Sequence, residues 1–265
     1  MNLLQQLLAL LNLAFVFNDS PVPKEVLDQF DDRTIKYSGG EYKDEVFHYR
    51  LLKPAKVEAG KQYPVVLFLH GAGERGDDNI KQLLYLPQWM TDAARREKFP
   101  CYLIAPQCRK DQKWANVDWS SDRAVAGPEM SDQMKVALMA LDEVTKEFPV
   151  DRRRVYLTGL SMGGYGSWDV AVRFPERFAA VAPVCGGGDE AQAAKLKNMP
   201  IWNWHGSVDK AVKVERSRRM IEAIRAAGGS PKYTELEGVG HNSWTAAYKD
   251  TDQLIEWMFE QKTAK

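Results

Sequence analysis

The stretch Gly159-Leu160-Ser161-Met162-Gly163 has the pattern G-x-S-x-G, and it decides the fold of this chain. It directly follows the apolar run 155–157 and precedes a segment of helical pattern, 165–174. A strand, a very tight turn and a helix are the context in which this pattern forms a nucleophile elbow. Glycine at both ends removes the Cβ atoms that would collide in so sharp a turn. The sequence therefore predicts that Ser161 is a nucleophile held in a strained backbone conformation.

A serine hydroxyl needs a base to become nucleophilic at neutral pH, and the base needs an orienting carboxylate. After an elbow of this kind the acid comes first in the chain and the histidine second. Of the four histidines, only His205 and His241 follow Ser161. We predict His241 as the base because it lies in a glycine-containing loop just after the alternating strand pattern 232–236. Asp209, in a turn at the end of another strand, is the predicted acid, and His205 is predicted to be a packed turn residue.

An acyl-transfer site also needs an oxyanion hole, which is formed by two backbone N–H groups aimed at the carbonyl oxygen. One donor is expected from Met162, the residue after the nucleophile. The second is expected from the loop after the buried strand pattern 65–69, where Ala72 is the first candidate and Gly71 the next. The alternative for this loop is an ordinary glycine-rich turn between a strand and a helix. His70, at the tip of the strand, is expected to brace the loop by hydrogen bonding.

Four segments together resemble the serine esterases of the α/β-hydrolase superfamily: 69–76 (LHGAGERG), 159–166 (GLSMGGYG), 205–209 (HGSVD) and 240–244 (GHNSW). They are most similar to the bacterial group that contains feruloyl esterases, polyhydroxyalkanoate-depolymerase-like and dienelactone-hydrolase-like proteins, some of them labelled predicted peptidases. The resemblance extends from about Tyr63 to Phe259. It implies a triad of Ser161, His241 and Asp209, and its motifs do not specify the substrate.

Strand and helix patterns alternate along the chain, which is typical of a mostly parallel sheet. With the resemblance, this predicts the α/β class and the α/β-hydrolase fold: a central sheet of about eight strands, helices on both faces and no large lid domain. An edge hairpin is expected at 35–52, and strands at 65–69, 101–105, 154–158, 178–184, 201–204 and 232–236. Helices are expected at 83–98, 129–148, 165–174, 214–227 and 251–261. Residues 31–265 are expected to form a single catalytic domain after a leucine-rich segment, 1–30.

Composition excludes several classes of partner and cofactor. Among 265 residues, 36 Lys and Arg balance 36 Asp and Glu, so charge gives no reason to expect binding to nucleic acid or an anionic membrane. The chain has neither a C-x-x-C pair nor an H-E-x-x-H motif, so we expect no metal, and the predicted chemistry needs no cofactor. Cys101, Cys108 and Cys185 are expected to be buried free thiols, with a Cys108–Cys185 disulfide as the disfavoured alternative.

Three tryptophans are candidates for substrate contacts. Trp114 and Trp119 lie in the long irregular stretch 107–128, and a loop of this length in a compact domain is usually functional. They are expected either to form a wall for an acyl or aromatic group or to anchor the loop on the core. Trp244, three residues after the predicted base, is a further candidate for the wall.

The N-terminal segment leaves the location of the protein open. Residues 3–17 are rich in leucine, but no Lys or Arg precedes them and no A-x-A site follows. The segment fits a degenerate signal peptide and an amphipathic helix equally well, so secreted, periplasmic and cytoplasmic locations all remain open. It is too short to span a membrane. The oligomeric state is also left open.

The predicted activity is hydrolysis of carboxylic esters with a short-chain or aromatic acyl group, including esters of the feruloyl type. The substrate is expected to be a small-molecule or polysaccharide-linked ester. A serine peptidase would use the same triad, and a non-catalytic binding protein on a hydrolase scaffold is the third alternative.

Overall fold

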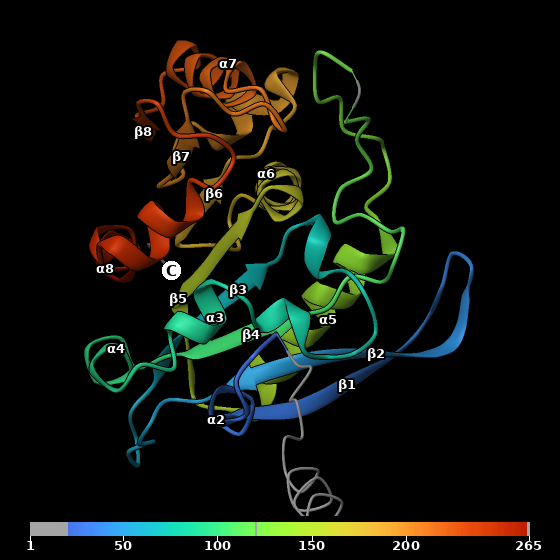
Figure 1. Ribbon diagram of the computed structural model, residues 1–265, viewed down its shortest axis with the longest axis vertical. Helices are drawn as coiled ribbons and strands as arrows, with labels where there is room; N and C mark the ends of the chain where they lie inside the picture. Colours follow the sequence, from blue (N-terminus) through green and yellow to red (C-terminus); the bar gives the residue numbers. More distant parts are fainter. Residues whose placement is uncertain (1–20, 120, 264–265) are drawn as a thin grey trace, which may run out of the picture.

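The computed structural model describes residues 21–119 and 121–263. Within this part of the chain, one eight-stranded sheet runs through the molecule in the order β1-β2-β4-β3-β5-β6-β7-β8 (Figure 1). The strands are β1 (Phe30–Gly39), β2 (Tyr42–Leu52), β3 (Tyr63–Leu69), β4 (Tyr102–Pro106), β5 (Val150–Leu160), β6 (Ala180–Val184), β7 (Trp202–Gly206) and β8 (Lys232–Leu236). The β1–β2 hairpin and the β2–β4 pair are antiparallel, and all pairs from β4 to β8 are parallel. The predicted mostly parallel sheet is therefore confirmed.

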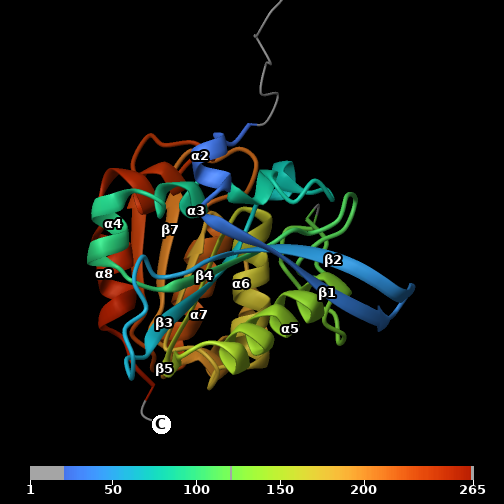
Figure 2. The same ribbon diagram turned by 90° about the horizontal axis from the view of Figure 1, so that it is seen from below.

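Helices cover both faces of the sheet. On one face, α5 (Asp132–Glu147), α6 (Met162–Arg173) and α7 (Glu215–Ala226) pack into one hydrophobic core. A second core joins the other face to α2 (Lys24–Leu27), α3 (Leu86–Trp89) and α8 (Gln253–Glu260). Figure 2 shows α5 and α6 on one side of the sheet, and α8 with the short α4 (Ala93–Lys98) on the other. This two-sided cover explains why all seven residues of β3 are buried.

The prediction of one long helix over 83–98 is wrong. The structure has three short elements there, namely the 3-10 turn η2 (Lys81–Leu83), α3 and α4. Tyr85 interrupts the first two with a φ of 69°, which is incompatible with a right-handed helix. Asp92 then starts α4 by accepting the N–H groups of Ala94 and Arg95. The sequence analysis also missed the 3-10 segment η3 (Glu190–Leu196) and the π-helical turn η4 (Ala246–Asp250).

The turn from β5 to α6 is as tight as the sequence predicts. Helix α6 begins at Met162, directly after Ser161, rather than at 165 as expected. A Cβ at Gly163 would lie 1.8 Å from the carbonyl oxygen of Leu69 in β3, and one at Gly159 would lie 2.5 Å from the carbonyl oxygen of Gly163. The pair of glycines therefore allows the helix backbone to contact the strand backbone directly.

Part of the N-terminal prediction falls outside the described residues. The leucine-rich run 3–17 precedes the first of them, so the division of the chain at residue 30 stays a prediction. Among residues 21–119 and 121–263, no helix combines the length and the apolar character that crossing a bilayer requires.

Replacing Gly163 by alanine is expected to destabilise the protein by about 3 kcal/mol or more, because the new methyl group would overlap the Leu69 carbonyl. Urea unfolding measures the change in the free energy of unfolding. Gly240→Ala is the matched control, since a Cβ there meets no atom within 4 Å. Equal stability of the two variants would contradict the close contact between α6 and β3.

Candidate active site

Ser161 lies at the carboxyl edge of the sheet in an unusual backbone conformation. Its φ is 52° and its ψ is −113°, a combination that non-glycine residues rarely adopt. Its N–H donates to the carbonyl of Val184 in β6 at 2.9 Å, and its carbonyl accepts the N–H of Tyr165 in α6 at 3.1 Å. Neighbouring elements on both sides thus hold the strained turn, as is common at functional sites.

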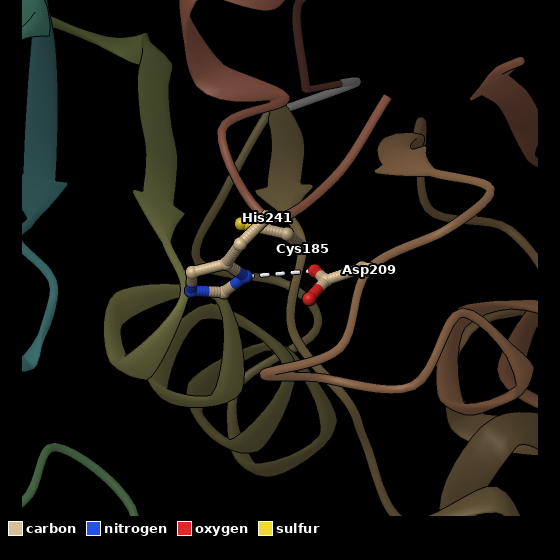
Figure 3. Close-up of side chains that lie close together, drawn as sticks. All are labelled: Cys185, Asp209 and His241. Atoms are coloured by element: carbon tan, nitrogen blue, oxygen red, sulfur yellow. Dashed lines mark hydrogen bonds and ion pairs between the residues drawn. The ribbon is translucent and has the colours of Figure 1, made fainter. Parts of the chain in front are cut away.

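The three predicted triad residues form one hydrogen-bonded chain. His241 Nε2 lies 2.9 Å from Ser161 Oγ. On the other side of the ring, His241 Nδ1 lies 2.7 Å from Asp209 Oδ2, the contact drawn in Figure 3. Because the carboxylate only accepts, Nδ1 carries the proton, which leaves Nε2 to accept from the serine hydroxyl. The serine follows β5, the aspartate follows β7 and the histidine follows β8, so three parallel strands deliver these groups to the same edge.

The carboxylate of Asp209 is buried and well supplied with donors. Its Oδ1 accepts the backbone N–H groups of Ala211 at 2.8 Å and Val212 at 2.9 Å. Burial alone would raise the pKa of Asp209, but hydrogen bonds from His205, His241 and the Val212 N–H together hold that pKa well below its ordinary value. The group therefore stays charged beside the imidazole that it orients.

His205 has a role that the sequence analysis missed. It is fully buried, and its Nε2 lies 3.2 Å from Asp209 Oδ2 and 2.8 Å from the carbonyl oxygen of Val212. Both of these atoms accept, so Nε2 carries the proton, while Nδ1 accepts from the Ser217 hydroxyl at 2.7 Å. His205 is therefore packed, as expected, but it lies in β7 rather than in a turn, and it is also a second donor to the acid. The four-residue spacing between the two residues was the available signal.

Two backbone amides next to Ser161 lack acceptors within their own helices. Met162 is the first residue of α6 and Ala72 is the first residue of the 3-10 turn η1 (Ala72–Glu74), and first-turn N–H groups have no intrahelical partner. A Cβ at Gly71 would lie 3.7 Å from Ser161 Cβ, so this loop runs beside the nucleophile. The N–H of Gly71 instead donates to the carboxyl of Glu74. Burial raises the pKa of that carboxyl, and this hydrogen bond offsets part of the rise. Of the two predicted loop donors, Ala72 is thus the better placed.

Hydrogen bonds from the side chains of His70 and Arg75 hold the loop that carries Ala72. His70 Nδ1 donates to the carbonyl oxygen of Gly71 at 2.6 Å, and its Nε2 accepts the N–H of Cys108 at 2.9 Å. Burial lowers the pKa of His70 to about 4, so the ring stays neutral and keeps this tautomer near neutral pH. Arg75 Nε donates to the carbonyl oxygen of Ala72 at 2.9 Å. The expected bracing role of His70 is confirmed by these contacts.

The three candidate tryptophans differ in their surroundings. Trp114 is 1% exposed and its indole N–H donates to the carbonyl of His70 at 3.0 Å, so it anchors the loop on the core instead of forming an open wall. Trp119 is half-buried, with its ring 6.3 Å from that of Tyr165. Trp244 is half-buried, and its ring meets the ring of His241 edge to face at 5.3 Å. The latter two remain candidates for substrate contact.

Cys185 lies behind the triad. Its sulfur and the ligand-type atoms of Asp209 and His241 all lie within 4.8 Å of one another (Figure 3). A metal bound to Nδ1 of His241 would have to replace the hydrogen bond to Asp209, so the geometry fits a triad better than a metal site. Burial raises the pKa of the Cys185 thiol to about 12, so it remains protonated. All three cysteines of the chain are free and buried.

Comparison with known proteins identifies related esterases and peptidases. The bifunctional acetylxylan esterase/xylanase of Neocallimastix patriciarum is 31% identical over 86 residues, which is 32% of this chain and 13% of that protein. Dipeptidyl-peptidase 5 of Porphyromonas gingivalis is 27% identical over 156 residues, 57% of this chain and 21% of that protein. The chain thus spans only a small part of the length of either relative.

Solved structures give the same fold. A thermostable esterase superimposes with a TM-score of 0.80 and 34% identity, covering 90% of this chain and 64% of that one. A ferulic acid esterase has a TM-score of 0.62 at 17% identity, covering 87% and 97% of the two chains, and supports the fold alone. The model of the family described as "Putative esterase" matches residues 42–248. This match covers most of the chain, including the elbow, both histidine loops and Ala72, and the chain therefore belongs to this esterase family.

Proposed function

We propose that this protein hydrolyses carboxylic esters through a triad of Ser161, His241 and Asp209. The observation that carries the proposal is the unbroken hydrogen-bonded chain from Ser161 Oγ through the imidazole to the buried carboxylate, with distances of 2.9 and 2.7 Å. Membership of the esterase family supports the reaction type. The free amides of Met162 and Ala72 support the stabilisation of an oxyanion at the same place.

In the first half of the reaction, Ser161 Oγ attacks the ester carbonyl while His241 Nε2 takes the hydroxyl proton. The carbonyl oxygen becomes an oxyanion that the Met162 and Ala72 N–H groups stabilise. Asp209 holds the imidazole in place and stabilises its charged form. His241 then gives the proton to the leaving oxygen, the C–O bond to the alcohol breaks, and an acyl-serine remains.

In the second half, a water molecule attacks the acyl-serine and His241 takes its proton. The bond between the acyl carbon and the serine oxygen breaks, and the proton passes from His241 to Ser161. The products are one alcohol and one carboxylic acid for each ester and water consumed. No redox step occurs, so the reaction requires no cofactor.

The proposed substrates are short-chain or aromatic acyl esters, either small molecules or groups linked to a polysaccharide. The similarity to an acetylxylan esterase supports a small acyl group on a carbohydrate. The half-buried rings of Trp119 and Trp244 support contact with an apolar or aromatic group. A long-chain lipid ester is not part of the proposal.

A serine peptidase is the second candidate function. The 27% identity to a dipeptidyl-peptidase over 57% of this chain favours it, since the same triad cleaves amides. Parallel assays on an ester and an amide with the same acyl group separate the two functions. We expect cleavage of the ester to be the faster by far. A higher kcat/KM for the amide would replace the proposed function by a peptidase.

Ser161→Ala is expected to reduce kcat for p-nitrophenyl acetate by ~10³-fold or more, because it removes the nucleophile. Asp209→Asn is expected to cost ~10⁴-fold while leaving the fold intact, because the amide favours the wrong tautomer of His241. Initial rates measure both effects, and Ser38→Ala, at an exposed position near the end of β1, is the matched control. Undiminished turnover by the alanine variant at position 161 would remove Ser161 from the mechanism.

Thiol reagents are expected to leave the activity intact, whereas a fluorophosphonate should abolish it. The thiolate is the reactive form of cysteine, and burial raises the pKa of the Cys101 and Cys185 thiols to about 12. Incubation with iodoacetamide at pH 8, followed by an ester assay and peptide mass spectrometry, tests this. Inactivation with alkylation of Cys185 would show that the thiol behind the triad ionises after all.

His205→Asn is expected to lower kcat/KM by ~10-fold or more, because Asp209 loses one hydrogen-bond donor to its charged form. The depressed pKa of Asp209 stabilises the folded protein above about pH 4, and this stabilisation is lost as the pH falls below that value. The variant raises this pKa. The free energy of unfolding should therefore differ less between pH 6 and pH 3 in the variant than in the wild type.

The matched experiment repeats the substitution in an Asp209→Asn background. There the part of the pH effect that depends on the carboxylate should vanish. If the substitution changed the pH dependence equally in both backgrounds, His205 would not act through Asp209.

A further inference from the structure

Tyr85 has a backbone conformation that is unfavourable for a tyrosine. Its φ is 69° and its ψ is −122°, close to the values of Ser161. This is the conformation of the first central residue in a type II′ turn, a position that glycine dominates. A bulky residue persists there only when its surroundings hold it, and such residues cluster at functional sites.

The ring of Tyr85 is linked to the base of the triad through one other aromatic ring. It lies 5.3 Å from the ring of Trp244, which in turn lies 5.3 Å from the imidazole of His241. The Tyr85 ring also meets the ring of Trp89 at 5.9 Å. Both Tyr85 and Trp244 are half-buried residues.

Tyr85 is also close to the loop of the oxyanion hole. Burial raises the pKa of its phenol, and the negative charge of Glu74 raises it further. Glu74 is the last residue of η1, the turn that begins with the proposed donor Ala72. The tyrosine thus neighbours this loop and, through Trp244, His241.

The chemistry of ester cleavage says which part of the substrate meets this side. His241 must give its proton to the leaving oxygen, so that oxygen faces the imidazole in the acylation step. The alcohol group attached to the oxygen therefore extends over the surface that borders His241. The ring of Trp244 borders the imidazole, and the ring of Tyr85 borders that of Trp244.

We propose that Tyr85 and Trp244 form the binding wall for the alcohol part of the ester, and that this wall selects cyclic alcohols such as a sugar or an aryl ring. The inference deepens the proposed function and rests on it. Two aromatic rings bury more apolar area against a cyclic group than against a methyl or ethyl group, and they need no change of shape to do so. This use of the ring explains why a tyrosine occupies a backbone conformation that suits glycine.

The test compares two acetates of alkyl alcohols, cyclohexyl acetate and ethyl acetate, so that leaving-group reactivity changes little. The wild type should prefer the cyclohexyl ester in kcat/KM. Tyr85→Ala should reduce this ratio by ~10-fold, because the ring contact is lost, whereas Tyr85→Phe should keep it. The ratio between ethyl butyrate and ethyl acetate, which reports on the acyl side, should stay the same in both variants.

Tyr42→Ala is the matched control, since Tyr42 is a half-buried aromatic residue in the β1–β2 hairpin, which projects away from the rest of the sheet (Figure 1). It should change neither ratio. An unchanged cyclohexyl-to-ethyl ratio in Tyr85→Ala, or an equal change in the butyrate-to-acetate ratio, would overturn the assignment to the alcohol side. Failure of the proposed function looks different, because the Ser161→Ala variant would then retain wild-type rates.

A stability measurement tests the strain independently of catalysis. Tyr85→Gly and Tyr85→Ala remove the same ring, but only glycine adopts the observed φ and ψ without penalty. The glycine variant should therefore melt at a higher temperature than the alanine variant, the reverse of the usual order. A lower melting temperature for the glycine variant would show that Tyr85 is not held under strain.

Discussion

The direct contact between the backbone of α6 and the backbone of β3 is the constraint on which the active site depends. No side chain fits between Gly163 and the Leu69 carbonyl, so the helix starts immediately at the end of β5. The connection has no spare residue, and Ser161 must take a left-handed φ to join the two elements. The same contact brings the first N–H of the helix and the loop after β3 to the two sides of one hydroxyl. The proposed nucleophile and the proposed oxyanion donors thus all depend on this one backbone contact.

A buried negative charge is the second feature that the site must accommodate. Taking a carboxylate out of water is costly unless donors replace the solvent. Around Asp209, two backbone N–H groups and two imidazoles do so. In the proposed mechanism one imidazole, that of His241, gains and loses a proton in each cycle. The other, His205, is fully buried and keeps its hydrogen bonds, so the acid retains a donor throughout.

Sequence patterns predicted what depends on local geometry. The elbow around Ser161, the order of acid and base, and the strand at 232–236 follow from residue type and spacing, and the structure brings the three side chains together. The break at Tyr85 was missed because its cause is tertiary: neighbouring aromatic rings hold a conformation that tyrosine alone disfavours. Residue pattern alone does not reveal this break, so one continuous helix was expected over 83–98. Trp114 is held by a hydrogen bond from its indole N–H to the carbonyl of His70, in the loop after β3. Spacing along the chain does not reveal this contact.

Both groups assigned to the oxyanion hole belong to the main chain. Met162 and Ala72 provide them through the amide that every residue except proline has. Exchanging either side chain leaves the donor in place, provided that the backbone keeps its path. An alanine scan would therefore lower activity at the proposed triad but leave the proposed oxyanion donors undetected, since residue 72 is already alanine and Met162→Ala keeps its N–H.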